Sequence, residues 1–144
     1  MNDPYNLQRF VDAQRSTYDQ ALAELQAGRK HSHWMWFIFP QIAGLGHSAM
    51  AQRYAIQNRD EAVAYLGHAL LGPRLHACAE ALMQHAGRPA RQILGPPDDI
   101  KLRSSMTLFD AVAPEAGIYR RVLDAFYDGE PDPATLSRLQ TPPP

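Results

Sequence analysis

Apolar residues recur along most of the chain at the three- and four-residue spacing that is typical of amphipathic helices. In the first stripe, Leu7, Phe10 and Val11 follow one another in this way, after a helix start at Asp3-Pro4. Similar stripes recur as far as residue 139. The pattern predicts helices over residues 3–14, 16–28, 58–66, 72–87, 102–113, 119–129 and 132–139.

Several of these helices carry local signals for their ends. The Ser16 hydroxyl is a predicted N-cap, and Gly28 suits the left-handed residue that follows a last helical turn. Asn58 and Glu61 have the spacing of a capping box, with asparagine in place of serine or threonine. Pro73 fits a first helical position, where its missing N–H costs nothing. These signals mark helix limits independently of the periodicity.

The most apolar run, Trp-Met-Trp-Phe-Ile-Phe at residues 34–39, is the one segment with strand character. Its aromatic and β-branched residues are typical of a buried strand. A single strand would have no partner for its backbone groups, so we favour a short buried helix over a strand. Phe39 itself should be extended, because it precedes Pro40.

Together the patterns predict an all-α fold, a single compact globular domain of about six to eight helices. The domain should span residues 1–140, and residues 141–144, Thr-Pro-Pro-Pro, should form a disordered tail. The segment 34–39 should be central and largely buried. The remaining core is expected from the apolar stripes, namely Phe10, Leu22, Leu25, Phe37, Leu66, Leu75, Leu82, Leu102, Met106, Phe109, Leu123 and Phe126.

Composition and charge narrow the class of partner. The chain has 144 residues, of which 45% are hydrophobic, and this length fits one domain with its own core. A formal net charge of −1 provides no basic excess for binding a nucleic acid duplex. The lone cysteine, Cys78, excludes an intramolecular disulfide, and no apolar run is long enough to span a membrane. With no signal peptide visible, we expect a cytoplasmic protein without a membrane partner.

Four short segments carry a resemblance to a known family. They are KHSHWMWFIFPQ at residues 30–41, GLG at 44–46, AVAYL at 62–66 and KLRSSMTLF at 101–109. The chain from Asp3 to Tyr127 resembles the bacterial family called domain of unknown function 1810. The resemblance implies an all-α single domain and brings no established activity, hence no catalytic residues. Some members are labelled calpastatin, a calpain inhibitor, but such inhibitors are long disordered repeats, whereas this chain has the pattern of a compact core.

The segment 30–36 holds a dense group of side chains suited to binding. Lys30, His31, His33, Trp34 and Trp36 place an ammonium group, two imidazoles and two indoles within seven residues. Histidine can act as acid, base or ligand, and tryptophan can stack on a flat ring or a cation. The group would form one wall of a pocket for a planar or anionic ligand; alternatively, the tryptophans are core anchors and the histidines a polar rim. Because a His-x-His pair alone lacks further ligands, no metal and no cofactor is predicted.

Residues 98–105 form a second group. On a helix, Asp98, Lys101 and Ser105 would share one face, and Ser104 would flank it, so that an acid, a base and two hydroxyls lie close together. Asp99 and Arg103 would form an i,i+4 pair on a neighbouring face. The alternative is an ordinary solvated face with its aspartates at the helix start. Adjacent serines are a poor choice for a helix interior, which indicates close packing or ligand contact.

Residues 44–49, Gly-Leu-Gly-His-Ser-Ala, match the G-x-G-x-x-A form of a dinucleotide-binding loop. That motif needs a strand before it, a helix after it and a parallel partner strand, and the chain has no βαβ pattern. We interpret the segment as the start of a helix at Ser48. A flexible loop leading into this helix could also present N–H groups to an anion, and that alternative stays open.

The leading hypothesis is a site for a small anionic or nucleotide-like ligand, with a hydrolase or transferase reaction as one option. The sequence does not decide whether the domain is an enzyme. The predicted ligand-binding residues are Lys30, His31, Trp34, Trp36, Lys101, Arg103, Ser104 and Ser105. His33, with Asp99 or Asp98, is the predicted acid–base pair, and His33 must line a common pocket with Lys101. The alternative is a non-catalytic interaction module with an exposed aromatic patch, as a monomer or homodimer.

Overall fold

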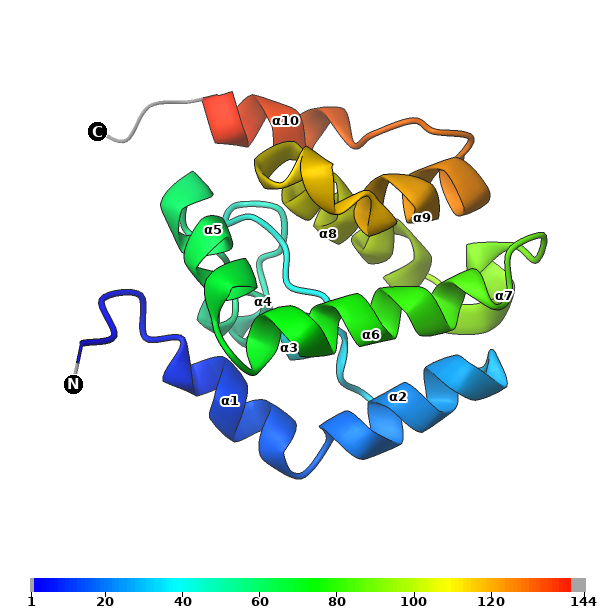
Figure 1. Ribbon diagram of the computed structural model, residues 1–144, viewed down its shortest axis with the longest axis horizontal. Coiled ribbons are helices and arrows are strands. Elements are labelled where there is room, and N and C mark those ends of the chain that lie inside the picture. The colour runs from blue at the N-terminus through cyan, green and yellow to red at the C-terminus, as the bar shows by residue number, and fades with distance from the viewer. Residues whose placement is uncertain (1, 141–144) are drawn as a thin grey trace.

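The computed structural model describes residues 2–140, in which helices make up almost all regular structure (Figure 1). The ten α-helices of these residues are α1 (Gln8–Arg15), α2 (Tyr18–Ala27), α3 (Met35–Ile38), α4 (Ala49–Arg53), α5 (Arg59–Gly67), α6 (Leu71–Met83), α7 (Ala90–Leu94), α8 (Asp98–Val112), α9 (Ile118–Tyr127) and α10 (Pro133–Gln140). A 3₁₀ helix, Pro114–Ala116, joins α8 to α9. The predicted tail, residues 141–144, lies outside the described residues.

The prediction of an all-α single domain is confirmed, but the expected number of helices was too low. Helix α7 has only five residues, too few for a periodic apolar stripe to stand out. The predicted helix start at Ser48 is confirmed, because the Ser48 hydroxyl accepts a hydrogen bond from the Ala51 N–H at 3.1 Å and caps the equally short α4. Strand-like pairing in the described residues is limited to a parallel bridge between Ile42 and Ile56. None of the helices in this part of the chain is both long and apolar enough to cross a membrane.

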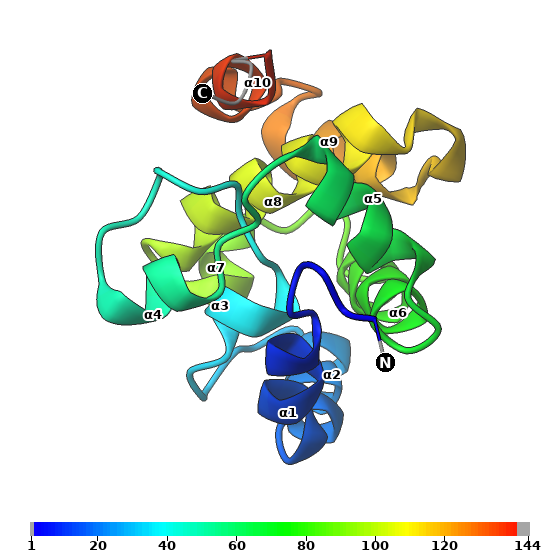
Figure 2. The ribbon, with the colours of Figure 1, turned by 90° about the vertical axis from the view of Figure 1, so that its left-hand side faces the viewer.

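The two longest helices, α6 and α8, organise the fold. Helix α6 packs against α2, α5 and α9, and α8 packs against α5, α7, α9 and α10. Helix α1 packs against α3, on the side of the molecule opposite α10 (Figures 1 and 2). The loop after α3 therefore starts on the side of α1 and rises toward α10 (Figures 1 and 2). It carries much of the irregular structure.

The core contains side chains from all parts of the chain. Of the twelve predicted core residues nine are buried, and the other three, Leu22, Leu66 and Phe126, are half-buried at its margin. The segment 34–39 forms the one-turn helix α3, and five of its six side chains are buried, as predicted. Cys78 is also buried, and burial raises the pKa of its thiol to about 12.

The helix ends confirm some local signals and correct others. Gly28 ends α2 with a left-handed φ of 73°, and the Asn58 side chain accepts a hydrogen bond from the Glu61 N–H at 2.9 Å, both as predicted. The prediction for Ser16 was wrong, because α2 begins after Thr17 and Ser16 makes no cap. Helix α1 begins at Gln8 rather than near Asp3, whose carboxylate instead accepts from the N–H groups at the helix start.

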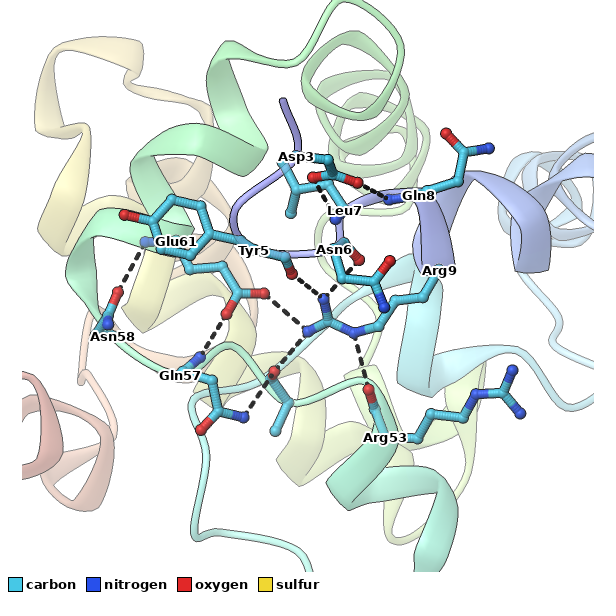
Figure 3. Close-up of polar contacts among 11 residues, drawn as sticks. Asp3, Tyr5, Asn6, Leu7, Gln8, Arg9, Arg53, Gln57, Asn58 and Glu61 are labelled. Carbon is cyan, nitrogen blue, oxygen red and sulfur yellow. Dashed lines mark hydrogen bonds and ion pairs between the residues drawn. The ribbon is translucent and has the colours of Figure 1, made fainter. Parts of the chain in front are cut away.

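Arg9 clamps the first helix to the segment between α4 and α5 (Figure 3). Its five N–H groups all donate, four of them to the backbone carbonyl oxygens of Tyr5, Asn6, Arg53 and Ala55. The fifth donates to Oε2 of Glu61 at 2.8 Å, and only 1% of the Glu61 side chain is exposed. Since every guanidinium donor is used, Arg9 is a structural clamp rather than a free binding group.

Candidate functional site

A buried carboxylate on α2 shapes the loop that carries the predicted site. Oε1 of Glu24 accepts hydrogen bonds from the backbone N–H groups of His31 and Ser32, at 2.7 and 3.0 Å, and from the Trp34 indole at 3.0 Å. Oε2 accepts from the Ser32 hydroxyl. The four donors fix the backbone of the loop and the ring of Trp34 relative to α2.

These contacts also set the ionisation of Glu24. Burial by itself raises the pKa of this carboxyl, but the hydrogen bonds from Ser32, from the His31 backbone and from the Trp34 indole outweigh it. The pKa of Glu24 is therefore lowered from 4.5 to about 2. The loop consequently rests on a carboxylate that stays ionised throughout the neutral range.

Lys30, Asp98 and Lys101 form a three-residue group that we call the Lys–Asp–Lys cluster. The Nζ of Lys30 lies 2.9 Å from Oδ2 of Asp98, and the Nζ of Lys101 lies 3.8 Å from Oδ1. A hydrogen bond of 2.8 Å from the Lys30 N–H to the Ile93 carbonyl oxygen holds the loop beside α7 and the start of α8. The structure thus brings together one member of the first predicted group and two of the second.

Each ammonium group of the cluster also lies over an indole ring. The Nζ of Lys30 is 5.0 Å from the ring centroid of Trp34, and that of Lys101 is 5.7 Å from the ring of Trp36, both within cation–π range. The two pairs differ in exposure. Trp34 is fully buried and the Lys30 side chain is 7% exposed, whereas Trp36 is half-buried and the Lys101 side chain is 30% exposed. A ligand can therefore reach the Trp36–Lys101 pair, and Trp34 is a core anchor.

The two histidines of the loop are exposed, and the predicted acid–base pair is not formed. No hydrogen bond or ion pair within residues 2–140 joins His33 to Asp99 or to Asp98. Asp99 lies on another side of α8, where its backbone carbonyl oxygen accepts from the Tyr127 hydroxyl. Its Oδ1 is buried without a hydrogen-bond partner among the described residues. The aspartate at the cluster is Asp98.

The other predicted residues of α8 contact the chain before α10. Arg103 donates to the carbonyl oxygens of Glu130 and Pro131, at 2.8 and 2.7 Å, and Ser104 donates to Oδ2 of Asp132 at 2.9 Å. Ser105 is fully buried, and its hydroxyl has no partner among the described side chains. The adjacent serines thus serve close helix packing, one of the two interpretations that the sequence allowed. Their role as ligand-binding residues stays a prediction.

Two surface hollows lie elsewhere on the molecule. One, of about 370 Å³, is lined by Asn6, Asp12 and Arg53 beside the Arg9 clamp. The other, of about 210 Å³, lies in the segment 41–57, where the sequence indicated a glycine-rich loop before a helix and left an anion site open as an alternative. Neither has His33 or Lys101 in its lining, so the prediction that these two residues share a pocket stays a prediction.

Comparison with known proteins places the chain among uncharacterised relatives. A family model described as "Protein of unknown function (DUF1810)" matches residues 4–139. The crystal structure of a conserved hypothetical protein, Rv1873 from Mycobacterium tuberculosis, is similar with a TM-score of 0.95 and 48% sequence identity. The similarity covers 97% of this chain and 100% of that chain. No protein with a curated description matches the chain.

Proposed function

The chain belongs to the DUF1810 family of proteins of unknown function, and we propose that it binds a small, flat organic anion at the face formed by Trp36, Lys101 and His33. The anion would be nucleotide-like, with a ring that stacks on Trp36 and a charged group that Lys101 binds. The ligand proposal does not rest on membership of the family, because no activity is known for the family that could be assigned to this chain.

The observation that carries the proposal is the charge of the Lys–Asp–Lys cluster. Lys30 and Lys101 are the only lysines in the sequence, and both lie within ion-pair distance of the single carboxylate of Asp98. Two positive charges and one negative charge leave an excess of one positive charge. Lys30 makes the closer contact and is almost fully covered, so the excess is available to an anion at Lys101.

The neighbouring side chains suit a flat ligand. Trp36 is half-buried beneath the Lys101 ammonium group and presents an indole face beside a positive charge. His31 and His33 are exposed on the loop that Glu24 holds in place, and in this proposal their imidazoles add hydrogen-bonding groups to the ligand site. If the bound ligand is hydrolysed or transferred, His33 is the group suited to act as acid or base.

A titration with AMP, monitored by tryptophan fluorescence, tests the proposal, with adenosine as the uncharged counterpart. We expect AMP to bind more tightly than adenosine. Lys101→Met, which keeps the aliphatic stem over Trp36, should weaken AMP binding by roughly tenfold or more, because a hydrogen bond to a charged group contributes about 1.5–3 kcal/mol. Adenosine binding should change little in this variant.

Arg15→Met is a matched control, because it removes one positive charge from the exposed end of α1. It should leave AMP binding unchanged. Equal binding of AMP and adenosine, equal losses in Lys101→Met and Arg15→Met, or no response to AMP would each contradict the proposal. Turnover of AMP by the wild-type protein but not by a His33→Gln variant would assign the acid–base role.

The alternative function, an interaction module built on an exposed aromatic patch, has less support. The large apolar side chains that are exposed in the described part of the chain are Val63, Leu70 and Ile100, none of them aromatic. Sedimentation equilibrium over a micromolar range tests this alternative directly. A stable dimer that Ile100→Asp converts to a monomer would favour it over ligand binding.

A further inference from the structure

The hollow of about 210 Å³ in the segment 41–57 has an uncharged lining of distinct chemistry. Its floor belongs to two short stretches that run side by side, held by hydrogen bonds of 2.8 Å from the Ile56 N–H to the Gln41 carbonyl oxygen and from the Ala43 N–H to the Ile56 carbonyl oxygen. All lining residues are glycine, alanine or isoleucine, apart from Gln41, Gln52 and Gln57. Its polar side chains are therefore all amides, which can both donate and accept.

Much of this amide capacity is unused. Gln52 donates to the His47 carbonyl oxygen at 3.0 Å, and Gln57 has a contact of 3.5 Å with the Ala55 carbonyl oxygen. The side-chain carbonyl oxygens of both residues have no hydrogen bond within the described chain. The side chain of Gln41 has none at all there, although it is half-buried. An incoming polar molecule would not have to break an existing network in order to use these groups.

A guanidinium group lies against one of the lining residues, Gly44, although Arg138 is not itself part of the lining. Gly44, a lining residue with φ of 97°, lies against Arg138 of α10, because a Cβ on Gly44 would lie 2.2 Å from the Arg138 Nη1. The loop after α3 rises toward α10 in both ribbon views (Figures 1 and 2). Arg138 is exposed and makes no hydrogen bond or ion pair within residues 2–140. The missing side chain at Gly44 thus leaves room for the Arg138 guanidinium, which has no acidic partner within the described residues.

We propose that this hollow is a second binding site, for a small carboxylate whose uncharged part carries hydrogen-bonding groups. Arg138 would bind the carboxylate, since a guanidinium presents two parallel N–H groups that match its two oxygens. The free amide of Gln41 and the carbonyl oxygens of Gln52 and Gln57 would bind the uncharged part. A volume of about 210 Å³ is below that of sites for drug-sized ligands, so the ligand must be small.

This site differs in residues and in ligand from the one proposed at Lys101. Its docked helix, α10, is held to α8 by the hydrogen bonds between Ser104, Thr107 and Asp132. Arg103 and Ser104 contact residues 130–132, directly before α10. These contacts therefore also fix the helix that carries Arg138. The α8 residues that hold α10, Ser104 and Thr107, are not members of the Lys–Asp–Lys cluster.

Side-chain amide resonances in ¹⁵N NMR spectra provide a direct test. The probes are four small carboxylates, glycolate, pyroglutamate, nicotinate and orotate, each compared with its uncharged amide or decarboxylated counterpart. We expect at least one carboxylate in the millimolar range to shift the amide signals of Gln41 and Gln52, with a weaker effect from its counterpart. Arg138→Gln should weaken that binding roughly tenfold or more, and Gln41→Leu should weaken it as well.

Matched variants separate the site from general effects. Arg15→Gln and Gln20→Leu change an exposed arginine and an exposed glutamine on α1 and α2, and should leave the titration unchanged. Lys101→Met should also leave it unchanged, and Arg138→Gln should leave AMP binding unchanged, so each proposal can fail without the other. The inference is wrong if none of the four carboxylates shifts these amide signals, or if the shifts persist undiminished in Arg138→Gln.

Discussion

Replacing Glu24 with glutamine would measure how firmly the loop that carries His31 is held. The carboxylate accepts four hydrogen bonds, two from backbone N–H groups and one each from the Ser32 hydroxyl and the Trp34 indole. Glutamine keeps one carbonyl oxygen, but its NH₂ group would face donors where the carboxylate presented an acceptor. At least one buried donor is then left without an acceptor, which costs about 1–3 kcal/mol.

The pH dependence gives a second, independent magnitude. A carboxyl whose pKa is lower in the folded protein than in the unfolded chain stabilises the fold above its unfolded pKa, and this contribution is lost as the pH falls. For Glu24 the loss should occur between about pH 4.5 and about pH 2. The difference of about 2.5 units, at about 1.36 kcal/mol each, sets an upper limit of about 3 kcal/mol.

Urea unfolding of the wild type and of Glu24→Gln, from neutral to acid pH, is the assay. The variant should be less stable by about 2–3 kcal/mol at neutral pH, and the gap should narrow toward acid pH. Backbone N–H groups also lower the pKa of Asp3, but that contribution is common to both proteins and cancels. The reasoning is refuted if the gap is the same at neutral and acid pH. It also fails if Glu115→Gln, at an exposed glutamate, loses as much stability.

Two further predictions concern backbone contact and buried charge. Gly72→Ala should lower the melting temperature in circular dichroism, because a Cβ there would lie 2.1 Å from the Leu66 carbonyl oxygen, whereas Gly67→Ala, in open space, should gain about 0.4–1 kcal/mol. Equal stability of these two variants would show that the backbone near Leu66 can move away from a Cβ at residue 72 without loss of stability. Arg9→Met should lower the free energy of unfolding in urea by about 3–5 kcal/mol, since it leaves the buried Glu61 carboxylate without a positively charged partner. Adding Glu61→Gln should recover part of that loss, and no recovery would mean that the backbone contacts dominate.

The helices that could be predicted from the sequence are those whose signals are local. Asn58 and Glu61 are three residues apart, and Gly28 follows an apolar stripe directly, so both ends were visible in the residues themselves. The prediction of Ser16 as an N-cap was wrong because Thr17, and not Ser16, directly precedes α2. Helix α7 was missed because five residues give no periodicity, and tertiary contacts decide whether so short a segment is helical.

The candidate site divides in the same way. Lys30 and the 98–105 group could be predicted from the sequence as site residues. Whether Asp98 or Asp99 contacts Lys30 could not, because that depends on which side of α8 faces the loop. Glu24 was missed although a signal existed, since it lies three residues after the buried Ala21 and just before Leu25, on the buried side of α2. The Arg9–Glu61 pair had no local signal, because 52 residues separate the two.

The single thiol of the chain lies where only an opening of the fold uncovers it. Cys78 sits on α6, the helix covered by α2, α5 and α9, and the thiolate is the reactive form of a cysteine. With the pKa raised to about 12 by burial, the folded molecule protects this sulfur through protonation as well as through lack of access. The rate at which a thiol reagent modifies Cys78 therefore reports how often the neighbouring helices separate from α6. It can be measured in native buffer without denaturant.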